Sequence, residues 1–243
     1  MTTPVLRKRP CPICGGTGYK PLAVRSIDLP ALPEPVQWEL HDVVCLYCAF
    51  VYSVKVYHDS YIEDYYRRTT IEVAADYNAL SRTALVERYA PSGSSILEYG
   101  PGVSGFKDSL GDGYSVDTVE IGCAPPQKYY DLTAAYYVLE HVPDPRNFIY
   151  GMRFVTKQWG FVVVEVPDLE HYPRHSLYPE HLNYFTAFHL KTLLETCGLT
   201  VLEHIKGHSR EFGMAMVGRV NPCAVTESKR LYKSGRGGCM GAK

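Results

Sequence analysis

The stretch Ile-Leu-Glu-Tyr-Gly-Pro-Gly-Val-Ser-Gly-Phe at residues 96–106 constrains the fold more than any other part of this sequence. Its apolar start predicts a buried strand, and the residues after it predict a glycine turn and then a helix. The glycines Gly100, Gly102 and Gly105 let the backbone approach a ligand where any Cβ would collide, and the first N–H groups of the helix point into the same space. The spacing predicts a cofactor-binding turn, with a glycine-bearing surface turn as the alternative.

Two acidic residues narrow the choice of cofactor. Glu98 stands two residues before the first glycine, and a second predicted strand brings Glu120 to its end. That is about where a βαβ unit places the carboxylate that binds a ribose. A carboxylate at position 98 suits a ligand with a cationic amino-acid end better than an anionic one. The pattern therefore favours S-adenosylmethionine over NAD.

Several segments in order resemble class I S-adenosylmethionine-dependent methyltransferases. Residues 96–106 look like the first motif of that family, residues 131–145 are similar to its fourth strand and following loop, and residues 160–168 to its fifth strand. The segment 180–186, Glu-His-Leu-Asn-Tyr-Phe-Thr, leads into a predicted helix that is capped by Thr186 and stops at Gly198. The resemblance implies a doubly wound, Rossmann-like α/β sheet that binds S-adenosylmethionine.

The order of the predicted elements agrees with such a sheet. Strands are expected at 95–99, 115–121, 131–139, 160–166, 200–206 and 212–219. Their apolar character suits burial on both faces, and the last two are expected to pair as an antiparallel hairpin at the sheet edge. A helix is expected from Ile71 onward, with an apolar stripe that includes Leu80 and Ala84. In the family the segment before the first strand folds over the cofactor, so Tyr66 is a candidate contact, with packing as the alternative.

The pattern departs from the family between Glu120 and Asp131. Residues 121–130 leave no room for the helix and third strand that the family has at this point, and Pro125-Pro126 argues against a helix. This abbreviation, between the second and fourth strands of the family fold, predicts a sheet that lacks an edge strand and a shallow adenine pocket. Low cofactor affinity, closure by a partner subunit and a degenerate, non-catalytic protein are the consequences left open.

Two Cys-x-x-Cys hooks lie near the N-terminus, Cys11 with Cys14 and Cys45 with Cys48. Two such hooks brought together give the closed tetrahedral S4 site that zinc prefers in structural roles. The segment between them could not support a core alone, so metal binding would supply folding energy. Redox and disulfide roles are the competing interpretations. The segment also resembles the zinc-binding domain that precedes some sugar and small-molecule methyltransferases, and a small zinc ribbon is expected.

Two histidines with acidic neighbours are expected at the carboxyl edge of the sheet, where open α/β sheets bind ligands. Glu140 and His141 follow the fourth strand and are expected to position the cofactor or cap the next helix. Tyr178, Glu180 and His181 resemble the cluster that deoxysugar C-methyltransferases use near the acceptor, which implies His181 as a general base. The same segment recurs in class I enzymes of other specificity, so positioning of the acceptor is the alternative.

Composition limits the partners. The 243 residues include 46% hydrophobic and 21% charged residues, as in an ordinary soluble globular protein. The net charge of -1 gives no field for steering toward nucleic acid or an anionic membrane, so a small-molecule substrate is expected, with an oligomer left open. No apolar run reaches the roughly 20 residues of a membrane helix, and no signal core follows the basic residues 7–9. A cytoplasmic protein is predicted.

The expected organisation has four parts: a zinc-binding module over residues 1–58, a helical connector and cofactor lid over 59–90, a methyltransferase-like domain over 91–221, and a flexible tail over 222–243. The leading hypothesis is a methyltransferase that acts on a small molecule, a sugar or a biosynthetic intermediate. The second is a binding or scaffold protein with a degenerate methyltransferase fold, structural zinc and no turnover. An NAD-linked oxidoreductase would need a substrate domain that this length leaves no room for.

Overall fold

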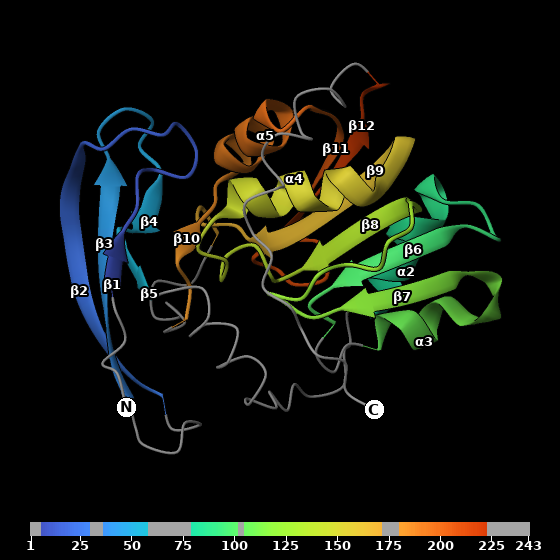
Figure 1. The fold of residues 1–243 in the computed structure, drawn as a ribbon, viewed down its shortest axis with the longest axis horizontal. Helices are drawn as coiled ribbons and strands as arrows, with labels where there is room; N and C mark the ends of the chain where they lie inside the picture. The colour runs from blue at the N-terminus through green and yellow to red at the C-terminus, as the bar shows by residue number, and fades with distance from the viewer. Residues whose placement is uncertain (1–5, 30–35, 58–78, 102–104, 172–179, 223–243) are drawn as a thin grey trace.

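A computed structural model describes residues 6–29, 36–57, 79–101, 105–171 and 180–222. It places a small N-terminal β module beside a larger α/β body (Figure 1). The module contains β1 (Leu6–Lys8), β2 (Tyr19–Leu29), β3 (Val36–Cys45), β4 (Val51–Ser53) and β5 (Lys55–Tyr57). The strands of the body are β6 (Ser95–Tyr99), β7 (Ser115–Val119), β8 (Tyr130–Tyr136), β9 (Thr156–Pro167), β11 (Leu199–Lys206) and β12 (Gly213–Val220). Its helices are α2 (Ala79–Tyr89), α3 (Phe106–Leu110), α4 (Pro145–Val155) and α5 (Ala187–Thr196), with a short 3-10 turn at Gly111–Gly113.

The body confirms the expected doubly wound α/β sheet. Its six strands follow the order β11-β12-β9-β8-β6-β7, in which β7, β6, β8 and β9 run parallel. The last two strands form the predicted antiparallel hairpin, with β11 at the edge. Along the sequence, β7 pairs with one side of β6, and β8 then pairs with the other side of β6. The strand order therefore reverses at β6 and β8, and a crevice is expected at their carboxyl ends.

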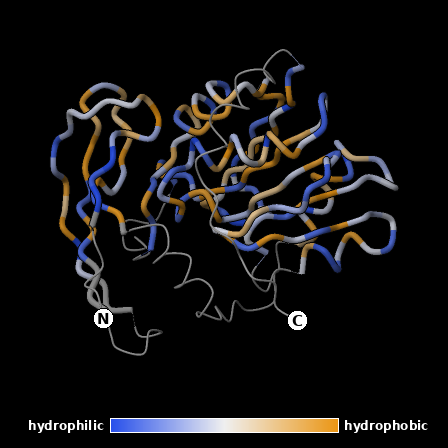
Figure 2. The backbone as a smooth tube through the Cα atoms, viewed as in Figure 1, coloured by the Kyte–Doolittle hydropathy of each residue, from blue (hydrophilic) through white to orange (hydrophobic). Residues whose placement is uncertain are grey.

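Helices cover both faces of this sheet (Figure 1), as the period-2 pattern of β9 requires. Val162, Val164 and Val166 join the core beneath α4 and α5, whereas Val163 joins the core beneath α2 and α3. Figure 2 shows hydrophobic residues recurring along the strands of the module and of the body. The near-continuous apolar sequence of β9 is thus explained by burial on both faces.

Local signals set the ends of several elements. Thr186 caps α5 and Gly198 follows that helix with φ +83, as predicted. Asp144 caps α4 by accepting a hydrogen bond from the backbone N–H of Asn147 at 3.0 Å. The strand expected at 131–139 ends earlier, at Tyr136, because Tyr137 adopts a left-handed φ of +56.

The apolar stripe predicted for the first helix is wrong in the described part of that helix. Leu80 is 77% exposed and Ala84 is also exposed, whereas Arg82 and Thr83 are buried together with Leu85 and Val86. The buried face is turned because Arg82 forms an ion pair with Glu165 on β9, with 2.9 Å between Nε and Oε2. A buried charge is tolerated there because it is paired. Positions 71–78 of the predicted helix lie outside the described residues.

The predicted abbreviation after the second strand of the body is confirmed. Residues 120–129, all of them described, form no helix and no strand between β7 and β8. Within the described residues β7 is consequently the edge strand on that side of the sheet.

The module and the body share one buried core. β10 (Asn183–Tyr184), which belongs by sequence to the body, pairs with β4 and completes a four-stranded sheet in the order β10-β4-β3-β2. Phe50 of the module packs against Phe185 of the body, with 5.3 Å between ring centroids. No helix in the described part of the chain is long and apolar enough to span a bilayer.

Candidate functional site

The glycine turn begins where β6 ends. Gly100 has a φ of +61, and its N–H donates to the carbonyl of Val119 at 2.8 Å. A Cβ at this position would lie 2.7 Å from Cγ2 of Val138, in the loop after β8. Gly100 is therefore required by the turn and by the approach of a neighbouring loop. Gly105 immediately precedes α3, and Gly102 lies outside the described residues.

The two acidic residues lie on adjacent strands at the carboxyl edge of the sheet. Glu98 lies near the end of β6 and is only 2% exposed, whereas Glu120 directly follows β7 and is exposed. The last residues of β6 and β7, Tyr99 and Val119, are paired in register. The two carboxylates thus flank the point where the strand order reverses, which is the place where a cofactor binds in such sheets.

Glu140 and His141 are in the loop after β8, at the same edge. Glu140 is 1% exposed, and neither carboxylate oxygen has a hydrogen-bond partner among the described residues. Oε1 of Glu140 lies 3.8 Å from Nε2 of His141. Burial, with a further contribution from the negative charge of Glu165, raises the pKa of Glu140 to about 8. Glu140 is therefore predominantly protonated at neutral pH.

His181 joins this pair from a segment that is distant in sequence. Its side chain is buried, and its ring meets that of His141 edge-on, with 4.8 Å between centroids. Burial, followed by the neighbouring His141 and Arg25, lowers the pKa of His181 well below 6.5, and burial also lowers the pKa of His141. Both imidazoles are therefore neutral at neutral pH. Side-chain nitrogen and oxygen atoms of Glu140, His141 and His181 lie within 4.8 Å of one another.

The remaining predicted site residues have different outcomes. Glu180 is half-buried, and its carbonyl oxygen lies 3.3 Å from Nδ1 of His141. Tyr66 and Tyr178 lie outside the described residues. The structure thus brings Glu140, His141 and His181 together, although the sequence presented them as two separate pairs.

A second buried polar cluster was not predicted. Glu165 is fully buried on β9 and contacts Arg82 and His208, the latter with 3.1 Å between Nδ1 and Oε1. Arg82 also lies over the ring of Tyr136, 4.5 Å from its centroid. The available signal was the single glutamate within the valine-rich segment Val162–Val166. This cluster ties α2 to the sheet close to the carboxyl edge.

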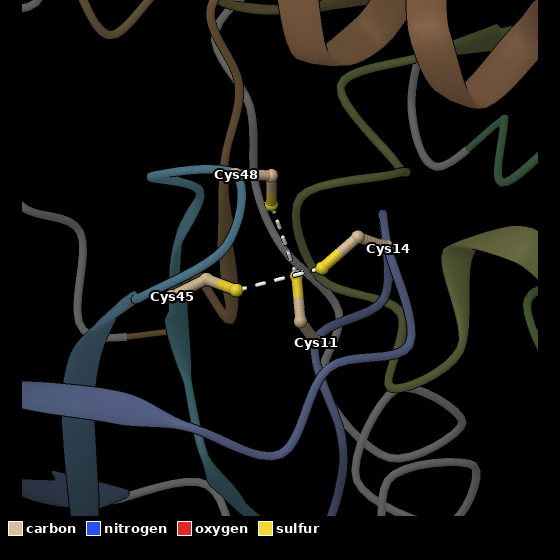
Figure 3. A group of neighbouring side chains, drawn as sticks. All are labelled: Cys11, Cys14, Cys45 and Cys48. Atoms are coloured by element: carbon tan, nitrogen blue, oxygen red, sulfur yellow. Dashed lines mark hydrogen bonds between the residues drawn. The ribbon is translucent and has the colours of Figure 1, made fainter.

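The four predicted metal-ligating cysteines are brought together (Figure 3). The sulfur of Cys11 lies 3.5 Å from that of Cys48, the sulfur of Cys14 lies 3.5 Å from that of Cys45, and all four lie within 4.8 Å of one another. A tetrahedral zinc site with Zn–S bonds of about 2.3 Å places its sulfurs about 3.8 Å apart. The arrangement therefore fits a zinc site with four cysteine ligands.

The hook thiols differ in how readily they ionise. Burial raises the pKa of Cys11 to about 11 and raises that of Cys48 further. The pKa of Cys45 is lowered to about 7 because hydrogen bonds, the first from the N–H of Tyr47, outweigh its burial. The thiols of Cys11 and Cys48, whose pKa values are raised, ionise readily only when a metal compensates the charge.

Comparisons with known proteins bear on the whole arrangement. The sequence matches a family profile described as "Methyltransferase domain" over residues 66–204, which is more than half of the chain. The comparison with curated protein sequences gives no match.

Several solved proteins have similar structures. The N-methyltransferase NodS from Bradyrhizobium japonicum, solved with S-adenosyl-L-homocysteine, has a TM-score of 0.50 at 15% identity, covering 66% of this chain and 98% of that chain. DesVI from Streptomyces venezuelae has a TM-score of 0.49 at 13% identity, covering 59% and 90%. An S-adenosylmethionine-dependent methyltransferase from Clostridium acetobutylicum has a TM-score of 0.48 at 10% identity, covering 67% and 98%. The likeness to NodS shows a shared fold.

Proposed function

The chain belongs to the methyltransferase-domain family, and from this premise we propose that it transfers a methyl group from S-adenosylmethionine to a small-molecule acceptor. The observation that carries the proposal is that the glycine turn, two carboxylates and a pair of imidazoles lie at the same edge of the sheet. Glu98 and Gly100 lie at the end of β6, Glu120 follows β7, and two neutral imidazoles, half-buried His141 and buried His181, follow β8 and β9. NodS, which shares the fold, binds a cofactor product of this class.

Different residues are proposed to bind different parts of the cofactor. In this proposal Glu120 accepts hydrogen bonds from the ribose hydroxyls, and Glu98 faces the cationic amino-acid end. Gly100, Gly102 and Gly105 let the backbone of the turn come close to the cofactor. Glu140, His141 and Tyr66 complete its surroundings. When bound, S-adenosylmethionine supplies a methyl group already activated on a sulfonium, so the protein needs to orient the acceptor and manage its proton.

We propose that His181 accepts the proton that the acceptor loses. A neutral imidazole can accept a proton from a hydroxyl, an amine or an activated carbon, and burial keeps His181 neutral at physiological pH. Glu180 and Tyr178 flank it in sequence and are proposed to orient the acceptor. The edge-on contact with His141 holds the imidazole at the carboxyl edge, where the reacting methyl group is expected.

The four hook cysteines are proposed to hold one structural zinc ion. All four ligand positions would be filled by sulfur, so the zinc site offers no open coordination position for catalysis. Its contribution in this proposal is folding energy for the module.

Calorimetric titration of the full-length protein with S-adenosylmethionine tests the cofactor, and transfer of a labelled methyl group to a panel of small-molecule acceptors tests the reaction. His181→Gln should reduce turnover by about 10²–10⁴-fold while leaving cofactor affinity nearly unchanged. His204→Gln, an exposed histidine on β11, is the matched control and should keep wild-type turnover. Absence of binding by the wild-type protein would overturn the proposal in favour of a scaffold without turnover.

A further inference from the structure

Three successive carbonyl oxygens beside His181 are bonded to side chains from other parts of the chain. The carbonyl of Glu180 lies 3.3 Å from Nδ1 of His141. The carbonyl of His181 accepts a hydrogen bond from Arg25 at 3.1 Å, and the carbonyl of Leu182 accepts one from Arg9 at 2.7 Å. Both arginines belong to the N-terminal module. From these contacts we propose that the N-terminal module forms part of the acceptor site and that Arg25 is a positioning residue for His181.

The side chain of Arg25 is fixed by a contact within its own module. Its guanidinium forms two hydrogen bonds to the carboxylate of Asp42 on β3, at 2.5 Å and 3.2 Å. The side chains of Arg25 and Asp42 are 15% and 6% exposed, so this pair is largely shielded from water. A two-point contact with a carboxylate fixes the plane of the guanidinium and directs its remaining N–H groups. Nη2, which contacts Asp42, also donates toward the segment that carries His181.

The same guanidinium contacts this segment at a second residue, Tyr184. It donates to the hydroxyl of Tyr184 and lies 5.7 Å from the centroid of that ring. Tyr184 is in β10, which pairs with β4 of the module in register Tyr184↔Val51. The segment that carries His181 therefore adds a strand to the sheet of the module, although by sequence it belongs to the body.

Arg9 also holds this segment. Its guanidinium donates to the carbonyls of Ser53 at 2.8 Å, Pro143 at 2.5 Å and Leu182 at 2.7 Å. Pro143 follows Glu140 and His141 in the loop after β8. One module side chain therefore joins the two loops whose side chains form the polar cluster, and this fixes their separation.

Arg25 also acts on His181 by charge. In the described part of the chain, the charged and titratable groups near His181 include His141, Glu140, Glu180, Asp42, Tyr184 and Arg25. A positive guanidinium bonded to the carbonyl of His181 disfavours protonation of that residue's imidazole. This inference deepens the proposed function and rests on it, because the neutral form is the one that accepts a proton. Arg25 would thus set the position of His181 and add to the effect of burial, which already favours the neutral imidazole.

The test uses zinc-loaded, full-length protein with isotope-labelled histidine, followed by NMR across a pH titration. The sequence has nine histidines, and His181→Gln identifies the His181 signals by their loss. Arg25→Gln should shift these signals and raise the pKa of His181 toward its ordinary value. Arg25→Lys keeps the charge but loses the planar guanidinium and its two-point contact with Asp42. It should therefore shift the His181 signals while changing the pKa of His181 less. In Arg25→Gln, backbone amides of residues 182–184 should exchange with solvent at least about tenfold faster.

Controls separate this inference from the proposed function. Arg88→Gln removes an arginine of α2 that pairs with Glu203 in the body, and it should leave the His181 signals unchanged. Titration with S-adenosylmethionine should give the same affinity for Arg25→Lys as for the wild type, because the glycine turn is a separate part of the site. If Arg25→Lys and Arg25→Gln both leave the His181 signals and amide exchange unchanged, the positioning role is overturned even where the cofactor binds. If the wild type fails to bind the cofactor while the His181 signals shift as expected, the proposed function fails and the structural coupling stands.

Discussion

Gly100 lies so close to Val138 that a Cβ at position 100 would be 2.7 Å from Cγ2 of the valine. Gly100 also has a φ of +61, which L side chains rarely adopt. Gly100→Ala therefore combines a strained backbone with a steric clash and should lower the free energy of unfolding by about 2–4 kcal/mol. Urea unfolding monitored by circular dichroism measures this change.

Gly93→Ala is the matched control. Gly93 has a φ of +92, but a Cβ there would meet nothing within 4 Å. It should therefore show the backbone cost alone, about 1–2 kcal/mol. Equal losses for the two variants would mean that the contact with Val138 contributes nothing. If only Gly100→Ala also weakens binding of S-adenosylmethionine, the turn itself serves the cofactor.

Zinc content provides a second prediction. Protein purified without added metal should contain about one zinc ion per chain by elemental analysis. Cys11→Ser should lose the metal and melt at a lower temperature, whereas Cys123→Ser, which changes a cysteine outside the hooks, should keep both properties. The carbonyl of Cys48 lies 2.8 Å from Nε2 of His189 on α5, so loss of zinc should also speed amide exchange in the body near that helix. Metal-free wild-type protein with an unchanged melting temperature would contradict a structural zinc.

The parts of the fold that sequence predicted correctly have local causes. Thr186 and Gly198 bound α5 through their own backbone chemistry, and two cysteine hooks carry their ligand spacing within four residues each. Residues 121–130 were correctly predicted to lack the family's helix and third strand because chain length alone excludes them.

The parts that were missed depend on distant contacts. Arg25 and His181 are separated by 156 positions, and no local pattern indicates that one holds the other. Leu80 is exposed where helical spacing predicted burial, because the pairing of Arg82 with Glu165 turns α2. Periodicity identifies a helix, but a buried ion pair decides which face of it meets the sheet.

Glu120 provides a third prediction, concerning the cofactor alone. Removal of a carboxylate that accepts hydrogen bonds from ribose hydroxyls should weaken binding by about 1.5–3 kcal/mol, which is roughly tenfold or more. Calorimetric titration of Glu120→Ala with S-adenosylmethionine measures this loss. Glu211→Ala changes another exposed carboxylate, in the turn between β11 and β12, and should bind like the wild type. Wild-type affinity in Glu120→Ala would show that the end of β7 does not contact the ribose.

The last prediction concerns Glu140 and the dependence of stability on pH. Burial raises the pKa of Glu140 to about 8, whereas an unfolded chain leaves a glutamate near 4.3. Between these values the folded state keeps a proton that the unfolded state has released. The contribution of Glu140 to the free energy of unfolding is therefore greatest below the unfolded pKa. It falls as pH rises toward 8, by up to about 1.4 kcal/mol per pH unit.

Glu140→Gln cannot release this proton, so its stability relative to the wild type should rise with pH across the same window. Urea unfolding of both proteins at several values between about pH 5 and 8 gives the difference, with an expected slope of up to about 1.4 kcal/mol per pH unit. His141 and His181 titrate in both proteins and largely cancel in this difference. Glu87→Gln, at an exposed position on α2, should give no slope. Parallel stability curves for wild type and Glu140→Gln would show that Glu140 is ionised in the folded protein, because a carboxylate with an ordinary pKa contributes no slope in this range.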